Sequence, residues 1–157
     1  MDKKRIESNI GLAYDCLEKN KEIFKKHEII EDNKKVVVAG ISSVYRGYIS
    51  TFGASVTTGN LLSAIAFFSK DGDGDGKRSE LIKVIFEILK GNKKKENVEI
   101  AEKNLFEYVR KRCQNASNIH RMKEEILDYA IAVKLAMNLF TIVENKSGKK
   151  KNTEETK

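Results

Sequence analysis

Apolar residues recur at intervals of three and four along most of the chain, which is the spacing of amphipathic helices. In the first such segment, Ile6, Ile10, Ala13 and Leu17 form one apolar stripe among lysines and glutamates. The same pattern continues with apolar residues at positions 23 and 24. It predicts a first helix that ends near His27.

Polar residues at positions 31–33 interrupt the pattern and supply candidate N-caps for a second helix. The apolar stripe of this helix consists of Val37, Ile41, Val44, Tyr48 and Phe52. The valines at 36–38, followed by Gly40, are also typical of a strand that enters a phosphate-binding loop. The residues after Gly40 lack the glycine and lysine spacing that such loops require, so we expect no nucleotide site there. A strand over the valines stays open as a local alternative.

The apolar pattern predicts four more helices farther along the chain. A nearly continuous apolar run over residues 61–68 is typical of a short buried helix, and a helix that is apolar on most sides follows at 81–89 and ends at Gly91. Residues 98–109 form an amphipathic pattern. The longest pattern covers residues 119–143, behind a polar break that offers Ser117 or Asn118 as a cap, and would span roughly 36 Å.

The length of 157 residues suits one domain, and the complete lack of proline favours long helices. We therefore expect an all-α fold, a single compact bundle of about six helices over residues 1–146. Residues 147–157 contain no apolar side chain and predict a disordered basic tail. No apolar stretch approaches the length of a membrane span, and the charged first residues do not resemble a secretory signal, so we expect a cytoplasmic protein.

The chain is basic, with 30 lysines and arginines against 23 aspartates and glutamates and a formal net charge of +7. This excess makes polyanions the natural class of partner. The basic residues come in short runs, at residues 3–5, 25–26, 34–35, 93–95, 110–112 and 149–151. Cations stabilise the C-terminal end of a helix, so for any one run the helix dipole is as good an explanation as a phosphate contact.

The most specific local motif is Asp-Gly-Asp-Gly-Asp-Gly at residues 71–76, which matches the first half of a calcium-binding EF-hand loop. Position 12 of that loop, where a bidentate glutamate must stand, would be Ile82. We therefore interpret the segment as a linker between helices. Whether Asp71, Asp73 and Asp75 bind a cation weakly stays open.

No arrangement of residues points to catalysis. Two histidines, His27 and His120, and two cysteines, Cys16 and Cys113, are the candidates for a dyad or a metal site, but no two of them share a helical turn or a ligand spacing. The cysteines lie far apart, and we expect reduced thiols. We expect no enzymatic activity, no metal and no cofactor, and a function in binding.

The centre of the chain resembles a known family. The segments Y-R-G-Y-I at 45–49 and G-N-L-L-S-A-I-A-F-F-S-K at 59–70 are similar to a Tyr-Arg pair and a following Gly-to-Lys segment in the small helical subunit of type III-B (Cmr) CRISPR RNA-guided effector complexes. The first helix and residues 132–140 also look similar, so the likeness covers most of the chain, although only the central segment is specific. Asn60 departs from the family, which often has an apolar residue there.

The resemblance implies a non-catalytic subunit that lies beside the backbone subunit of the complex, together with further copies of itself, and serves antiviral defence. It would line the groove that holds target RNA paired with guide RNA. The resemblance assigns phosphate contacts to Arg46 and Lys70, and Tyr45 would stack on a base or pack. Charge alone adds Lys34 and Lys35. A helical adaptor that binds protein without touching nucleic acid stays open as the alternative.

Overall fold

The computed structural model describes residues 1–74 and 76–144, and these form six helices and three strands. The helices are α1 (Lys3–Lys19), α2 (Val44–Thr58), α3 (Leu61–Phe68), α4 (Arg78–Lys95), α5 (Leu105–Arg112) and α6 (Ala116–Met137). The strands are β1 (Phe24–Glu31), β2 (Lys34–Ser42) and β3 (Ile142–Val143). The prediction of about six helices is confirmed, whereas the prediction of an all-α fold is wrong because it leaves out the sheet. The tail predicted over residues 147–157 lies outside the described residues.

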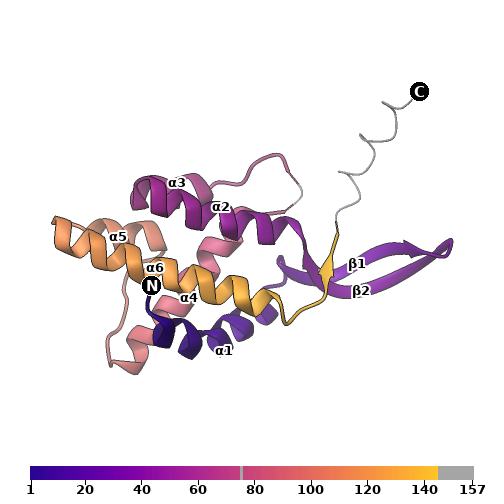
Figure 1. Ribbon diagram of the computed structural model, residues 1–157, viewed down its shortest axis with the longest axis horizontal. Coiled ribbons are helices and arrows are strands. Elements are labelled where there is room, and N and C mark those ends of the chain that lie inside the picture. The colour runs from indigo at the N-terminus through magenta and orange to yellow at the C-terminus, as the bar shows by residue number, and fades with distance from the viewer. Residues whose placement is uncertain (75, 145–157) are drawn as a thin grey trace.

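The helices pack into one body, and β1 and β2 project from one end of it (Figure 1). α6 packs against both α1 and α2, and α4 packs against all three of these helices. Large side chains that are completely buried between them include Phe52, Phe68, Leu17, Ile85 and Leu89. Burying one such side chain stabilises the fold by roughly 1.5–3 kcal/mol, so this shared interior fixes the positions of α2 and α6 relative to each other.

The helix α1 ends at Lys19, well before the predicted end near His27. The cause is Asn20, whose Oδ1 accepts the backbone N–H groups of Glu22 and Ile23, each at 3.0 Å. Asparagine side chains readily form such local turns and thereby compete with helix formation. The chain therefore turns after α1 and continues as β1.

β1 and β2 form an antiparallel hairpin in the segment where the sequence predicts the end of one helix and the start of the next. Glu31 pairs with Lys34 next to the turn. Asp32 and Asn33 form the turn with φ values of 48° and 62°. Two consecutive left-handed residues make the two-residue turn whose twist matches that of a hairpin. The predicted helix start is thus wrong, and the alternative of a strand over residues 36–38 is confirmed.

We call this hairpin, residues 24–42, the β arm, and its base is fixed to the helical body by β3. β3 pairs in parallel with the end of β2, and Ile41 donates its N–H to the carbonyl oxygen of Thr141 at 2.9 Å. Gly40 is required beside this contact, because a Cβ there would collide with the same carbonyl oxygen. The last helix ends at Met137, earlier than predicted, because the chain leaves α6 to reach the arm.

Three other helix boundaries also differ from those predicted. α4 continues through Gly91, where a Cβ would lie 2.9 Å from Cδ2 of Leu12, so this glycine serves the close approach of α1 and α4 instead of ending the helix. α5 begins only at Leu105. α6 begins earlier than predicted, after Asn115, whose side chain accepts the N–H of Asn118 at 2.9 Å.

Candidate nucleic-acid interface

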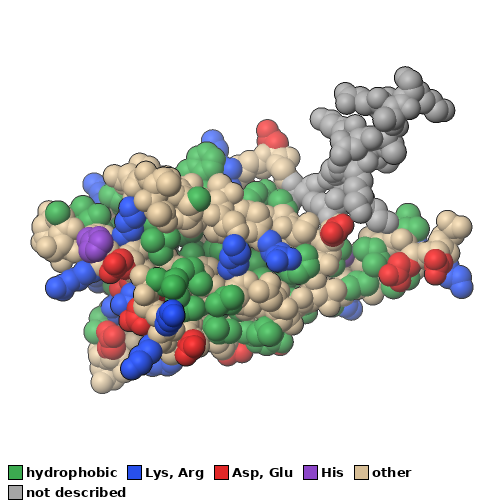
Figure 2. All heavy atoms as spheres, in the orientation of Figure 1, with side chains coloured by type: hydrophobic (Ala, Val, Ile, Leu, Met, Phe, Trp, Pro, Cys, Tyr) green, Lys and Arg blue, Asp and Glu red, His purple; other side chains and the backbone are tan. Residues whose placement is uncertain are grey.

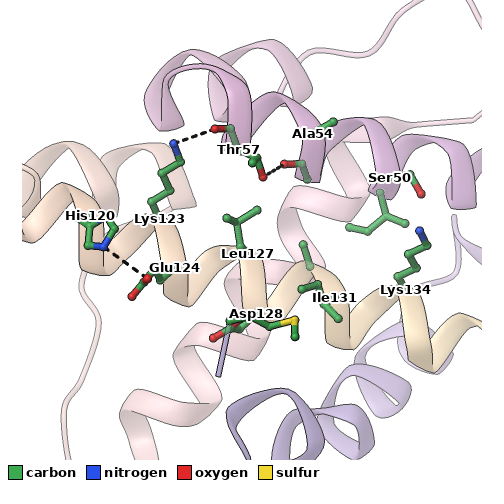
Figure 3. A pocket seen from close by; sticks show the side chains of 14 residues that line it. Ser50, Ala54, Thr57, His120, Lys123, Glu124, Leu127, Asp128, Ile131 and Lys134 are labelled. Atoms are coloured by element: carbon green, nitrogen blue, oxygen red, sulfur yellow. Dashed lines mark hydrogen bonds and ion pairs between the residues drawn. The ribbon is translucent and has the colours of Figure 1, made fainter. Parts of the chain in front are cut away.

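A surface groove of about 490 Å³ lies between α2 and α6. On the α2 side it is lined by small residues, namely Ser50, Gly53, Ala54 and Thr57. On the α6 side, Leu127 and Ile131 point into the groove (Figure 3). The groove therefore has a narrow apolar floor, and a ligand that enters it comes close to the backbone of α2.

Cations stand at both ends of this groove. At one end, Nζ of Lys123 donates to the backbone carbonyl of Thr57 at 3.2 Å. At the other end, Lys134 lies on the side of α6 that faces Ser50 (Figure 3). A helix rises 1.5 Å per residue, which places the two lysines about 16 Å apart along α6.

Arg46 extends this row of cations. It is exposed and stands one turn of α2 before Ser50, so it lies on the same side of that helix. α2 and α6 run antiparallel, because Thr57 meets Lys123 at one end of the groove and Ser50 meets Lys134 at the other, so Arg46 follows Lys134 along the groove. Within the described residues neither Arg46 nor Lys134 forms an ion pair, and both charges are available to a ligand.

A buried carboxylate beneath the groove is neutralised by the N-terminal segment. Asp128 is 1% exposed, and its Oδ2 accepts a hydrogen bond from Nη1 of Arg5 at 3.2 Å and from the backbone N–H of Asp2 at 3.2 Å. Figure 2 shows basic side chains beside a hydrophobic patch on this face of the molecule. The ion pair removes a negative charge that would otherwise repel an anion in the groove.

The residues predicted to contact nucleic acid lie on three separate elements. Arg46 is in α2, one turn before the groove residue Ser50, and Lys70 follows the end of α3. Lys34 and Lys35 begin β2 next to the turn of the β arm, far from the helical body (Figure 1). All four side chains are exposed, but the structure does not gather them into one surface.

Tyr45 is part of the core. The residue is 2% exposed, its hydroxyl accepts the backbone N–H of Lys77 at 3.0 Å, and it donates to the backbone carbonyl of Glu22 at 3.4 Å. Burial raises the pKa of Tyr45, because the charged phenolate would lose its hydration. The ring is closed to a base, so of the two roles that the resemblance leaves to Tyr45, the structure shows packing.

The aspartate loop is tied to the start of α4. The carboxylate of Asp71 accepts the backbone N–H and the hydroxyl of Ser79, each at 3.0 Å, and the carbonyl of Lys70 accepts a hydrogen bond from Nε of Arg78. Burial acts to raise the pKa of Asp71, but the hydrogen bonds from Ser79 and the neighbouring cations together lower it. Asp71 thus has the structural contacts of a linker residue, while Asp75 lies outside the described residues.

The residues considered for a dyad lie on different elements. His27 is in β1, with Nε2 3.2 Å from the carbonyl oxygen of Gly40, and His120 is in α6. Cys16 and Cys113 are free thiols, and burial raises the pKa of both. Among the described residues, no group of three or more His, Cys, Asp or Glu side chains is arranged to hold a metal ion. Over the same part of the chain, no helix combines the length and apolarity needed to cross a membrane.

Lys123 and Lys134 are the groove residues that sequence reasoning overlooks, because neither belongs to a run of basic residues. Their helical spacing is the available signal, since with Leu127 and Ile131 they fall on one face of α6. That spacing does not reveal which helix packs alongside. Only the structure shows that α2 packs alongside α6, and this packing brings Arg46 near the two lysines.

The basic runs at the ends of α4 and α5 meet around a second pocket of about 540 Å³, which Arg121 of α6 also lines. Lys93 and Arg112 are already in ion pairs there. Nη1 of Arg112 lies 2.7 Å from Oε1 of Glu102, and Nζ of Lys93 lies 3.6 Å from Oε1 of Glu125. We prefer the α2–α6 groove as the candidate for a polyanion, because Arg46, the residue that the sequence resemblance marks, lies one helical turn from its lining, and among the described residues neither Arg46 nor Lys134 forms an ion pair.

No protein family model matches the chain, and no curated protein or solved structure is significantly similar to it. The fold and the groove of the described residues therefore define the architecture of this protein, and they assign it to no family. They give a helical body with a cation-flanked groove on its surface and a projecting β arm.

Proposed function

We propose that this chain is the small, non-catalytic subunit of a type III-B (Cmr) CRISPR RNA-guided effector complex, and that its α2–α6 groove contacts RNA phosphates. The observation that supports this proposal is the pair of cations Lys123 and Lys134 that line one open groove, with Arg46 one helical turn beyond Ser50 on the α2 side. Arg46 is also the residue to which the sequence resemblance assigns a phosphate contact. The proposed setting is antiviral defence in the cytoplasm.

The groove suits contact with the RNA backbone more than reading of bases. Its floor of small and apolar side chains offers few donors and acceptors that could distinguish one base edge from another. The guanidinium of Arg46 can bind a phosphate through two parallel hydrogen bonds, whereas each lysine acts as a point charge. Each phosphate neutralised on a single strand contributes about −0.7 to the slope of log affinity against log salt, without regard to sequence.

In this proposal the subunit lies beside the backbone subunit and further copies of itself, along target RNA paired with guide RNA. Three cations give one copy only weak affinity. Several copies aligned on one strand multiply that affinity, because each bound copy raises the effective concentration of the next contact. Scission belongs to neighbouring subunits.

Copurification with the other subunits tests the assembly. A tagged full-length chain is expected to recover the backbone subunit together with guide RNA. The assembled complex is then prepared with Arg46→Glu and Lys134→Glu, and a control complex with Lys94→Glu and Lys95→Glu makes the same charge change at the exposed end of α4.

A gel shift with target RNA compares these complexes. We expect about tenfold weaker binding from the groove variant, equivalent to about 1.4 kcal/mol, and wild-type binding from the control. Failure to recover the backbone subunit, or equal RNA affinity of the two variant complexes, would refute the proposal.

Exposed apolar side chains favour a protein-binding adaptor as the second candidate. Phe67 is 59% exposed, Leu139 is 65% exposed and Val37 is 58% exposed. If the adaptor function holds, Phe67→Ser and Leu139→Ser abolish assembly, whereas the groove substitutions leave RNA affinity unchanged in an intact complex. The gel shift therefore separates the two candidates.

A further inference from the structure

The β arm is long for a hairpin with so little support. β1 and β2 are paired over their whole length, from Phe24 opposite Ile41 to Glu31 opposite Lys34. β3 extends the sheet only at the base of the arm. A two-stranded hairpin is marginally stable in water, and an additional strand is the usual source of further stability.

The two edges of the arm differ in charge. β1 carries charged residues along its length, namely Lys25, Lys26, Glu28 and Glu31. β2 has no charged residue after Lys35, since it continues as Val-Val-Val-Ala-Gly-Ile-Ser. Charged side chains, lysine above all, protect an exposed edge strand against pairing with another chain. The β2 edge lacks this protection over most of its length.

The turn determines which backbone groups of β2 point outward. In an antiparallel pair, alternate residues exchange both hydrogen bonds with the opposite strand, and the residues that flank a two-residue turn form the first such pair. Lys35, Val37 and Ala39 therefore direct their N–H and C=O groups away from β1. The next residue of this series, Ile41, agrees with the assignment because its N–H is bonded outward to Thr141.

We infer that the β2 edge pairs antiparallel with the same edge of a second copy of this chain, about a two-fold axis at Val36. Beside Gly40, the β2 edge is already occupied by Thr141, which accepts the N–H of Ile41. A register centred on Val37 would push the turn of the second copy into Thr141, whereas a register centred on Val36 stops short of it. A register centred on Lys35 would place the Lys35 side chains of the two copies directly opposite each other, which is unfavourable. Among the described residues of the β2 edge, the register centred on Val36 avoids both conflicts.

Charge placement also fits this register. Lys35 of each copy lies opposite Val37 of the other, and Lys34 lies opposite Val38, so no two lysines face each other across the interface. Each pair of Lys35 and Val37 exchanges two backbone hydrogen bonds. The product is a continuous sheet in the order β1, β2, β2, β1. Because the pairing covers only the segment of β2 between the turn and Gly40, we expect an interface below the roughly 1,200 Å² of a stable complex, and hence a reversible dimer.

Cysteine cross-linking tests the register. Val36 of the two copies would form a non-hydrogen-bonded pair with Cα atoms about 4.5 Å apart, which a disulfide can bridge. In a chain with Cys16 and Cys113 replaced by serine, V36C is expected to give a disulfide-linked dimer under mild oxidation. The control is I29C, since Ile29 lies directly opposite Val36 within the arm but about 14 Å from its own copy, three strand spacings away. Equal dimer yields from the two variants would overturn the inference.

Sedimentation of the full chain tests the edge independently. We expect the average mass to rise toward that of a dimer between about 10 μM and about 1 mM protein. V37P removes one outward N–H and leaves the bonds between β1 and β2 intact, so it is expected to stay monomeric. E28P makes the matching change on β1, directly opposite Val37, and is expected to dimerise as the wild type does. A monomeric wild type, or identical behaviour of V37P and E28P, contradicts the proposed edge.

Discussion

Replacing Asp128 with asparagine would test how the N-terminal segment is fastened beneath the groove. The buried carboxylate accepts hydrogen bonds from Arg5 and from the backbone N–H of Asp2, and an amide group cannot accept from both in the same way. Hydrogen bonds to a charged group contribute roughly 1.5–3 kcal/mol, and removing one partner of a buried ion pair costs roughly 3–5 kcal/mol. The Arg5 side chain is 36% exposed, so water can solvate its charge after the substitution. We therefore expect Asp128→Asn to lower the free energy of unfolding by about 3 kcal/mol, the lower end of the range for a broken buried ion pair.

Urea unfolding followed by circular dichroism at the helix band measures this loss. In a chain of this size, about 3 kcal/mol also lowers Tm by roughly 6–12 °C. Lys83→Gln is the control, because Lys83 is 68% exposed in its ion pair with Glu80 and such pairs contribute at most about 1 kcal/mol. A double-mutant cycle with Arg5→Gln isolates the coupling between Arg5 and Asp128.

Either of two results would contradict a stabilising ion pair between Arg5 and Asp128. The first is a loss no larger than that of Lys83→Gln. The second is strict additivity of Asp128→Asn and Arg5→Gln, because two residues that share an ion pair must show a coupling energy.

Three further substitutions test separate contacts. Tyr45→Phe removes the acceptor of the backbone N–H of Lys77 in a partly buried hydrogen bond, and we expect urea unfolding to show a free energy of unfolding lower by about 0.5–1.5 kcal/mol; an unchanged midpoint contradicts the hydrogen bond. The pKa of Asp71 is lower in the folded state, so its carboxylate stabilises above the unfolded value near 3.8 and this contribution is lost as pH falls through the folded value. Asn has one acceptor oxygen, so Asp71→Asn should keep at most one of the two hydrogen bonds from Ser79 at neutral pH, and stability should depend less on pH in the acid range; an unchanged pH dependence argues against these bonds. Gly40→Ala forces a methyl group against the carbonyl of Thr141, for which we expect a loss of about 1–3 kcal/mol and faster amide exchange at the base of the arm; an unchanged exchange rate rules out the clash.

The interior helices are predictable from sequence because apolar spacing alone defines them. α3 occupies the residues that the apolar run predicts, and α4 includes the predicted segment 81–89. Their ends are harder to predict, because they depend on single polar side chains and on tertiary contacts. Asn20 stops α1 by binding two backbone N–H groups, and Gly91 is kept inside α4 by the close approach of Leu12.

The apolar pattern does not predict the strands of the β arm, because these strands do not alternate cleanly between apolar and polar residues. Ile29 and Ile30 are adjacent, and so are the three valines of β2, so apolar residues occur on both faces. The available signal is the pair Asp32 and Asn33 between two segments rich in β-branched residues, since both residue types tolerate a positive φ.

The site is predictable only in part. The resemblance points to Arg46, and the structure places this residue on α2, one turn from the groove residue Ser50. The sequence also marks Tyr45, which packs inside, and Lys34 and Lys35, which lie on the arm. Lys134 joins Arg46 only through the antiparallel packing of α2 on α6, which no local pattern reveals.

The salt dependence of RNA binding by the full chain tests the central claim most directly. Fluorescence anisotropy with a single-stranded RNA between about 50 and 200 mM salt should give a slope of about −2 for the three cations of the groove. The variant with Arg46→Glu and Lys134→Glu should retain a slope of about −0.7, from Lys123 alone. The control with Lys94→Glu and Lys95→Glu should keep the wild-type slope. The same slope in all three proteins would contradict the account.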